Sequence, residues 1–200
     1  GRPPARAARA RSCGQESALM GDVSIRPAEQ ADLAVLAEVF GDQGFFEDRF
    51  TRQAKGLGVL FAAWCSARPV GAVYLWLEDA EEPPIRGHLP GVPLLTHLEV
   101  APDARNRGIG AALVHAAEDY LAGHGHALGA LAVRTDNTRA ARLYSRLGYR
   151  DWGHGTVVCY AERVSPDGRT ISEAERCHVL VKGLPDDSPA PLASRTCGER

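Results

Sequence analysis

The spacing of apolar residues changes from that of a strand to that of a helix in the middle of the chain. Every second residue from 94 to 100 falls on one side of an extended run, which a following Ala-Pro-Asp then ends. The residues expected on that side are Leu94, Thr96, Leu98 and Val100. From Ile109 onward, apolar positions recur at the spacing of a helix. The pattern therefore predicts a strand, a loop that contains Gly108 and Gly110, and a helix.

The same comparison of spacings predicts the other elements. The predicted strands are 23–25, 59–66, 70–77, 128–133, 156–163 and 177–182, and the predicted helices are 33–40, 45–55 and 137–147, the last closed by Gly148. Because a helix connects the strands at 94–100 and 128–133, we expect these two to run parallel. The segment 78–93 is acidic and then rich in proline, so we expect it to be irregular.

Length and composition indicate one soluble globular domain. The chain has 200 residues, 44% of them apolar, and a net charge of −2, which gives no indication of a surface devoted to nucleic acid. It has no run of about 18 apolar residues and no hydrophobic signal segment, so we expect a cytoplasmic protein without a membrane span. The expected domain covers 22–183. Residues 1–21 are expected to be a disordered extension or an expression remnant, with a transit peptide as the alternative, and 184–200 a flexible tail.

The cysteines and histidines do not indicate a metal site. Five cysteines form no C-x-x-C pair, and their odd number argues against a disulfide framework as well as a zinc site. Cys65, Cys159 and Cys177 lie in apolar runs and are expected to be packed thiols. His124 and His126 flank a glycine without further ligands nearby, which favours a loop at a helix end.

The loop before the predicted helix at 109 has the composition of an anion-binding turn. The first turn of a helix has backbone N–H groups without partners, and glycine lets that backbone touch a phosphate. Arg105 and Arg107 add positive charge, which favours a diphosphate over a single carboxylate. No Gly-Lys-Ser/Thr follows, and Leu113 stands where the dinucleotide fingerprint has its third glycine. Taken alone, the turn is more typical of an ordinary glycine-rich connection.

A second motif lies downstream, from Asn137 to Tyr149. It reads Asn-Thr-Arg-Ala-Ala-Arg-Leu-Tyr-Ser-Arg-Leu-Gly-Tyr. Together with Arg105-x-x-Gly108-x-Gly110, it resembles the GCN5-related N-acetyltransferase (GNAT) superfamily, in outline over 22–183 and specifically over 94–151. The resemblance implies an α/β (α+β) fold with a mixed, twisted sheet of about six or seven strands, about four flanking helices and splayed central parallel strands. It also implies acetyl-CoA as co-substrate and no metal.

The resemblance also assigns site residues by their positions in the motifs. The expected acetyl-CoA site consists of the strand edge Leu98, Glu99 and Val100, the loop Arg105, Asn106, Arg107, Gly108, Ile109, Gly110 and Ala111, and the helix residues Asn137 and Tyr144. The backbone N–H of Val100 is the expected oxyanion donor, and Tyr144 is the expected general acid. The alternative for Tyr144 is a core aromatic residue with a satisfied hydroxyl.

The general base is less clearly indicated. Several relatives have a glutamate where this chain has Leu94, and the peptide N-terminal acetylases have one where it has Ala132. We favour Glu99 as the base, directly or through water; His97 is the other polar candidate, and a packing role is the alternative for either residue. Further residues in segments that often line the acceptor side, which the sequence does not rank, are Glu47, Asp48 and His154.

The function expected from the resemblance is an acetyl-CoA-dependent N-acetyltransferase in which a primary amine attacks directly in a ternary complex. A small-molecule amine or antibiotic is slightly preferred over a peptide N-terminus or lysine, because the peptide-enzyme glutamate is absent and acidic residues at 78–82 could attract a cationic amine. The other interpretation of this acidic segment, and the favoured one, is a solvated connection between strands. The alternative function is a non-catalytic acyl-CoA-binding sensor. Longer acyl groups and a homodimer stay open.

Overall fold

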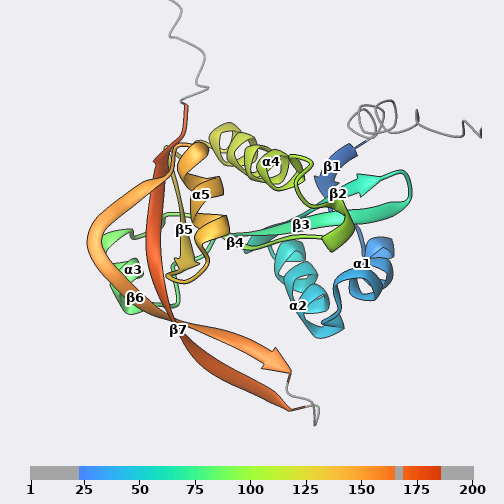
Figure 1. Ribbon diagram of the computed structural model, residues 1–200, viewed down its shortest axis with the longest axis horizontal. Helices are drawn as coiled ribbons and strands as arrows, with labels where there is room; N and C mark the ends of the chain where they lie inside the picture. Colours follow the sequence, from blue (N-terminus) through green and yellow to red (C-terminus); the bar gives the residue numbers. More distant parts are fainter. Residues whose placement is uncertain (1–22, 165–168, 186–200) are drawn as a thin grey trace, which may run out of the picture. The chain divides into compact units, whose positions relative to one another are not determined.

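A computed structural model describes residues 23–164 and 169–185 (Figure 1). The described residues contain seven strands, five α-helices and two short 3-10 helices, and the strands form a mixed sheet. The predicted α/β class and strand number are therefore confirmed, with one α-helix more than expected. The chain divides into two compact units, residues 23–78 with 95–117 and residues 79–94 with 118–185. The expected splay between the strands at 94–100 and 128–134 stays a prediction.

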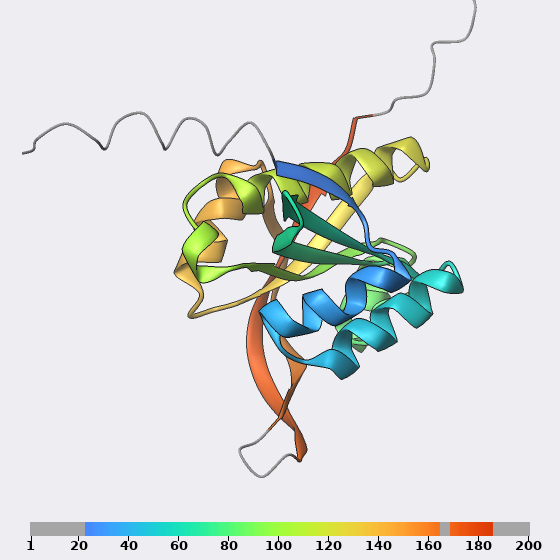
Figure 2. The same ribbon diagram turned by 90° about the vertical axis from the view of Figure 1, so that its right-hand side faces the viewer.

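The first unit is built on antiparallel strands. Its elements are β1 (Val23–Pro27), the 3-10 helix Gln30–Asp32, α1 (Leu33–Phe40), α2 (Gln43–Ala54), β2 (Gly58–Cys65), β3 (Arg68–Trp76), most of β4 (Leu94–Val100), the 3-10 helix Pro102–Ala104 and the first part of α4 (Ile109–Gly123). β2 pairs with both β1 and β3. Both β2 and β3 are buried along nearly their whole length, as continuous apolar runs require. The helices α1 and α2 lie side by side (Figure 2).

A close approach fixes α4 against β3 in this unit. A Cβ atom added at Gly71 of β3 would lie 2.8 Å from Cδ1 of Leu113 and 3.1 Å from the carbonyl oxygen of Glu99. Only glycine therefore allows the first turns of α4 to pack this tightly on the strand. The packing places the start of α4 beside the end of β4, where the loop motif lies.

The second unit contains a three-stranded antiparallel arrangement in the order β5-β7-β6. Its elements are α3 (Pro83–His88), the end of α4, β5 (Leu128–Arg134), α5 (Thr138–Arg146), β6 (Arg150–Val164) and β7 (Thr170–Gly183). β5 pairs with β7 only from Cys177 to Gly183. The rest of β7 pairs with β6 alone, and the two strands extend past β5 (Figures 1 and 2). We call residues 158–164 and 170–176 the arm.

The predicted lengths of β6 and β7 were too short. None of the arm residues whose side chains are described is buried, and the exposed large apolar ones among them are Val158, Tyr160 and Ile171. Without buried positions, residues 170–176 lack the alternation from which strands are predicted. The missed start of β6 contains Gly153 and Gly155, whose φ values are 84° and 79°. The sequence also predicts a turn at Pro166-Asp-Gly168, between these two strands. That turn lies outside the described residues, as do residues 1–21 and most of the C-terminal tail.

The prediction that 78–93 is irregular was wrong, because α3 forms there. Pro83 and Pro84 occupy its first turn, where a missing N–H costs nothing and the fixed φ suits a helix. Ile85 is buried and anchors the helix. Asp79 Oδ1 accepts a hydrogen bond from the N–H of Gly91 at 2.9 Å, so the acidic start of the segment also serves its folding.

The strict alternation predicted for β4 was also wrong. Leu94 and Leu95 are both buried, and His97 has a φ of 51°, in the left-handed region. A left-handed residue interrupts the pleat, so side chains before and after it do not follow a single two-residue period. The interruption turns His97 out of the regular pattern just before the predicted site residues.

Cysteine and histidine placement follows the sequence in most respects. Cys177 is buried, while Cys65 and Cys159 are half-buried, and all three are free thiols. His124 and His126 follow the end of α4, as expected for a loop. Among the described residues, no group of three or more His, Cys, Asp or Glu side chains could hold a metal ion. No helix in this part of the chain is long and apolar enough to cross a membrane.

Candidate active site

The loop between β4 and α4 has the backbone geometry of an anion cradle. Asn106 and Gly108 have φ values of 62° and 79°, so left-handed residues alternate along the loop. The first helical hydrogen bond of α4 runs from the N–H of Ala112 to the carbonyl of Gly108 at 3.0 Å. The N–H groups that precede Ala112 in this turn therefore have no acceptor within the helix. Such N–H groups at a helix N-terminus suit the diphosphate of a coenzyme A molecule.

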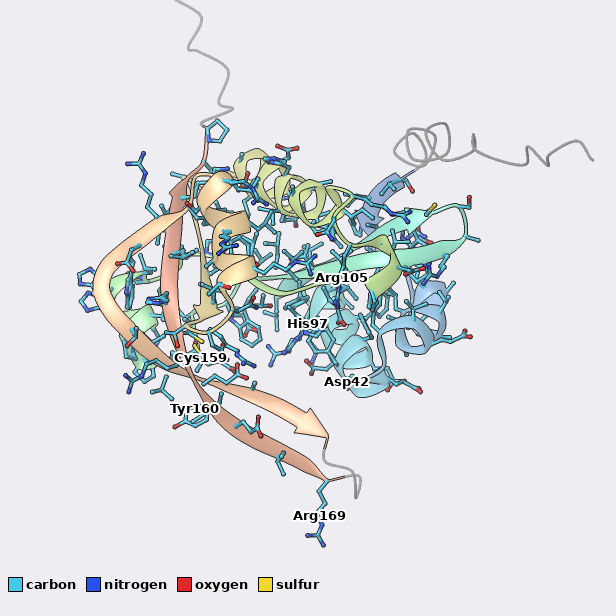
Figure 3. All side chains as sticks on the ribbon, in the orientation of Figure 1. Asp42, His97, Arg105, Cys159, Tyr160 and Arg169 are labelled. Carbon is cyan, nitrogen blue, oxygen red and sulfur yellow. The ribbon has the colours of Figure 1, made fainter. Side chains whose placement is uncertain are left out.

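Two arginines tie this loop to its neighbours in the first unit. Arg105 Nε donates to the carbonyl oxygen of Val100 at 3.0 Å, which fixes the loop against the end of β4 (Figure 3). Arg68 forms a fork with Asp103, with Nη–Oδ distances of 2.7 and 3.1 Å. That hydrogen-bonded arginine holds the pKa of Asp103 below its usual range. Arg107 has an exposed side chain beside the same turn.

A cavity of about 240 Å³ lies beside the loop, on the side of β1 to β3. Its lining is mostly apolar, with three charged side chains, from Arg68, Asp103 and Arg107. Of the predicted acetyl-CoA residues, only Arg107 and Ile109 contribute to it. The cavity therefore differs from the predicted cofactor surface along the edge of β4.

His97 and Glu99 form a polar pair next to that edge. His97 Nε2 lies 3.4 Å from Glu99 Oε2, and the two side chains are 36% and 38% exposed. The imidazole stacks on Phe45 of α2, with ring centroids 3.9 Å apart. The left-handed backbone at His97 and the stacking on Phe45 together orient the imidazole toward Glu99. The pair has the composition of a proton acceptor whose histidine is held by a carboxylate.

Aromatic rings and arginines from α2 and β3 pack beside this pair. The guanidinium of Arg49 lies 4.9 Å from the ring centroid of Phe45, 5.1 Å from that of Tyr74 and 5.4 Å from that of Trp76. Burial raises the pKa of Tyr74, whose hydroxyl has no hydrogen-bond partner. Its hydroxyl occupies the place that a side chain at Gly58 would need. The packing of α2 on β3 thus positions Phe45 under His97.

The acidic residues proposed for the acceptor side are already paired. Asp48 accepts hydrogen bonds from Arg49 at 2.7 Å and from Arg52 at 3.2 Å. Arg52 also binds Glu78, and Glu47 accepts a hydrogen bond from Gln43 at 2.7 Å. Of the acidic residues at 78–82 that were expected to attract a cationic amine, Glu78 thus has its charge offset by Arg52.

The second unit contains the predicted helix residues. Asn137 is the N-cap of α5, and its side-chain oxygen accepts a hydrogen bond from the N–H of Ala140 at 3.1 Å. Tyr144 lies in the last turn and is 7% exposed, and burial raises its pKa to about 12. The helix ends as predicted, with Gly148 at a φ of 90°. A different part of this unit holds His154, which stacks on His88 with ring centroids 3.8 Å apart.

The structure thus groups the predicted site residues within each unit. In the first unit, the loop, the edge of β4 and Glu99 lie together; in the second, Asn137 and Tyr144 share one helix. Sequence reasoning missed the packing of Phe45 and Arg49 around His97. The four-residue spacing of Phe45 and Arg49 on a predicted helix was a signal for one shared face, although not for its partner. The catalytic and binding roles stay predictions.

Residues 26–149 match the Acetyltransferase (GNAT) family. The chain belongs to this family. The match contains the β4 to α4 loop and the Asn137 motif on which the resemblance rested, so the predicted family is confirmed. The family consists of acetyltransferases, in agreement with the predicted class of enzyme, an acyltransferase.

Curated relatives of this GNAT chain align over short segments. A mycothiol acetyltransferase of Renibacterium salmoninarum is 36% identical over 70 residues, 35% of this chain and 21% of that protein. A mycothiol acetyltransferase of Clavibacter sepedonicus is 48% identical over 54 residues, 27% of this chain and 18% of that protein. The alignments span about a fifth of the length of these relatives.

Solved structures show the same GNAT fold over nearly their whole length. The ribosomal-protein-S18-alanine N-acetyltransferase from Escherichia coli has a TM-score of 0.59 at 18% identity, over 85% of this chain and 98% of that one. An N-acetyltransferase from Staphylococcus aureus Mu50 has a TM-score of 0.61 at 12% identity, over 82% and 99%. At such identities the likeness shows the fold alone.

Proposed function

We propose that this GNAT chain transfers an acetyl group from acetyl-CoA to a primary amine by direct attack in a ternary complex. The observation that carries the proposal is the loop from Arg105 to Ala111, whose alternating left-handed residues expose the first turn of α4. The loop fits a diphosphate because its binding groups are backbone N–H donors backed by Arg105 and Arg107. Acetyl-CoA would supply the activated thioester.

The edge of β4 would hold the pantetheine arm through backbone groups of Leu98, Glu99 and Val100. Backbone pairing of this kind is insensitive to side-chain identity. The contact between Arg105 and the Val100 carbonyl keeps the strand end and the phosphate loop in a fixed relation. The N–H of Val100 would donate a hydrogen bond to the developing negative charge on the thioester oxygen.

An amine must lose a proton to attack, since its pKa near ~10.4 keeps it charged at neutral pH. The His97 and Glu99 pair would accept that proton, directly or through a water molecule, and Glu99 would stabilise the imidazolium. Glu99 alone was the base expected from the sequence. The 3.4 Å separation between Nε2 and Oε2 supports a shared role for both residues.

Tyr144 would donate a hydrogen bond to the leaving sulfur. With a pKa raised to about 12 by burial, its hydroxyl keeps its proton at neutral pH. A thiolate whose conjugate acid has a pKa near ~8.5 is a weaker base than the Tyr144 phenolate, so solvent can complete the protonation. Tyr144 then acts chiefly by stabilising negative charge on sulfur as the C–S bond breaks.

The acceptor we favour is a small-molecule amine. The absent glutamates at Leu94 and Ala132 support this preference over a peptide. The pairing of Glu78 with Arg52 weakens the acidic attraction of residues 78–82 as a supporting reason. The curated relatives are named for mycothiol, and two structures of the same fold are named for ribosomal-protein alanine, so the names do not favour one class. A cytoplasmic location is part of the proposal, and the three free cysteines support it.

The proposal is tested by measuring release of free CoA thiol from acetyl-CoA with aminoglycosides, polyamines, amino acids and N-terminal peptides, against a blank without acceptor. Calorimetry with acetyl-CoA on the same preparation measures binding separately. One acceptor well above the blank supports the transferase and names its class. Binding of acetyl-CoA with no acceptor response in an extended amine panel would favour the sensor. Folded protein that does not bind acetyl-CoA would contradict both.

A further inference from the structure

Three buried side chains and the half-buried Lys182 form a cluster at the C-terminal end of α5. They come from α4, α5, the turn after α5 and β7: Glu118, Tyr144, Tyr149 and Lys182. Tyr149 is 4% exposed, and Tyr144 and Glu118 are each 7% exposed. A carboxylate and an ammonium rarely lie this deep unless they are paired.

Tyr149 contacts Tyr144 in two ways. The rings meet edge to face, with centroids 5.7 Å apart and an interplanar angle of 68°. The N–H of Tyr149 also donates to the carbonyl oxygen of Tyr144 at 3.0 Å. α5 has nine residues, and Tyr144 lies in its last turn, where helices fray. The ring of Tyr149 packs against that turn and opposes fraying.

Tyr149 is itself fixed from the other side. Lys182 Nζ lies 5.6 Å from the ring centroid of Tyr149 and 2.7 Å from Glu118 Oε2. Burial raises the pKa of Tyr149, and the neighbouring Glu118 carboxylate raises it further, so its hydroxyl stays protonated. The aliphatic part of Lys182 also passes the C-cap, because a Cβ atom at Gly148 would lie 3.8 Å from Lys182 Cε. The ion pair therefore braces the Tyr149 ring and the end of α5 together.

We propose that Tyr149 is a positioning residue for Tyr144, and that the Glu118–Lys182 pair holds Tyr149 in place. The inference rests on the proposed function, because it gives the Tyr144 hydroxyl a part in transfer. A hydroxyl that must meet a leaving sulfur loses much of its effect when it moves by about 1 Å. The packing of the Tyr149 ring, rather than its hydroxyl, supplies the restraint.

A double-mutant cycle on kcat tests this inference, with the amine that gives CoA release in the wild type. Tyr149→Leu should lower kcat by about tenfold and change the KM for acetyl-CoA by less than about twofold. Tyr149→Phe, which keeps the ring, should stay within about twofold of the wild type. In a Tyr144→Phe background, Tyr149→Leu should lower kcat by less than about twofold, because the group that it positions is gone.

Two results would overturn the inference. One is an equal loss of kcat from Tyr149→Leu in both backgrounds, which is the signature of a merely structural residue. The other is a Tyr144→Phe enzyme as fast as the wild type, which removes the role of Tyr144 while the wild-type assay still shows transfer. An enzyme without transfer at all would contradict the proposed function itself.

Replacements at Lys182 keep the test decisive if Tyr149→Leu fails to fold. Lys182→Met should lower kcat about threefold. Lys182→Arg keeps the charge and the ion pair, so its kcat should equal that of the wild type. The loss should again vanish in the Tyr144→Phe background. Equal kcat for the Met and Arg variants would show that the pair does not hold Tyr149.

Discussion

The predicted site residues of the two units differ in the groups that they provide: backbone N–H groups in the first unit and a side-chain hydroxyl in the second. In the first unit, the proposed binding groups are backbone N–H groups of the β4 to α4 loop, whose residues Asn106 and Gly108 are left-handed. In the second, α5 presents a single buried hydroxyl, that of Tyr144, inside a cluster of side chains. Backbone sites tolerate many side chains but depend on conformation, whereas a buried hydroxyl depends on the packing of its neighbours. We therefore expect changes in the loop to weaken acetyl-CoA binding and changes at Tyr144 to lower turnover.

The largest effect is expected at Gly108. Gly108→Val forces a β-branched residue into a φ of 79°, which should distort the loop and weaken acetyl-CoA binding by about a hundredfold in calorimetry. Gly125→Val is the matched control, because Gly125 has a φ of 81° in the loop after α4. It should lower the melting temperature with acetyl-CoA affinity unchanged. Equal loss of affinity in both variants would show that strain alone, rather than the loop, is responsible.

A loss confined to turnover is expected at Tyr144. Tyr144→Phe should lower kcat by about a hundredfold with little change in acetyl-CoA affinity, because it removes a hydrogen bond made to the leaving sulfur. Steady-state kinetics beside calorimetry separates the two quantities. A parallel loss of affinity would show that Tyr144 binds the coenzyme rather than assisting its departure.

The pKa of Tyr144 also predicts a pH profile. Its hydroxyl loses its proton only as the pH rises through about 12, so the donor is fully present below that value. Between about pH 8 and 10, loss of the Tyr144 proton should therefore not lower kcat. The wild type and Tyr144→Phe should have the same pH dependence over this range. An alkaline decline of kcat, present in the wild type and absent from the variant, would mean that the pKa of Tyr144 is much lower in the working enzyme.

A smaller effect is expected from the His97 and Glu99 pair. Glu99→Gln should lower kcat/KM by about tenfold near neutral pH, because the imidazole loses the carboxylate that stabilises its charged form. His97→Asn tests the partner, since asparagine tolerates the left-handed backbone that this position requires. If neither variant differs from the wild type, the amine loses its proton to another group.

The smallest effect is expected far from both regions, at the start of the 3-10 helix. Arg26 forks onto Asp32 at 2.6 and 3.0 Å, and this hydrogen-bonded arginine lowers the pKa of Asp32. A lowered folded-state pKa stabilises the protein above the unfolded value near ~3.9, and the contribution is lost as the pH falls through the folded value. Asp32→Asn should cost about 1 kcal/mol of unfolding free energy at pH 7. Urea titrations over a series of pH values should show this difference at pH 7 and a steady decrease as the pH falls through the folded value.

The regions that carry the two motifs were predictable because a few residues within each region determine its conformation. Gly108 and Gly148 mark left-handed turns, and Asn137 marks a helix start, so the loop and α5 formed where expected. α3 was missed because two prolines at a helix start resemble a breaker. The β7 part of the arm was missed because none of its described residues is buried.

The candidate site was predictable in its backbone parts and less so in its side chains. Spacing identified the strand edge and the loop, whose geometry depends on few residues. The stacking of His97 on Phe45 joins residues about 50 positions apart, and the Glu118–Lys182 pair joins residues 64 apart. Local spacing carries no information on such contacts, because tertiary packing decides them.

Because of the arm, the backbone amides of β7 should exchange at different rates in the two halves of the strand. From Cys177 to Gly183 the strand pairs with β5, and its residues 177, 178, 180 and 181 also pair with β6, whereas from Thr170 to Glu175 it pairs with β6 and not with β5. A two-stranded ribbon opens far more readily than the middle of a sheet. Hydrogen exchange should therefore begin at the end of the arm next to Arg169 (Figure 3) and reach the inner half of the strand much later.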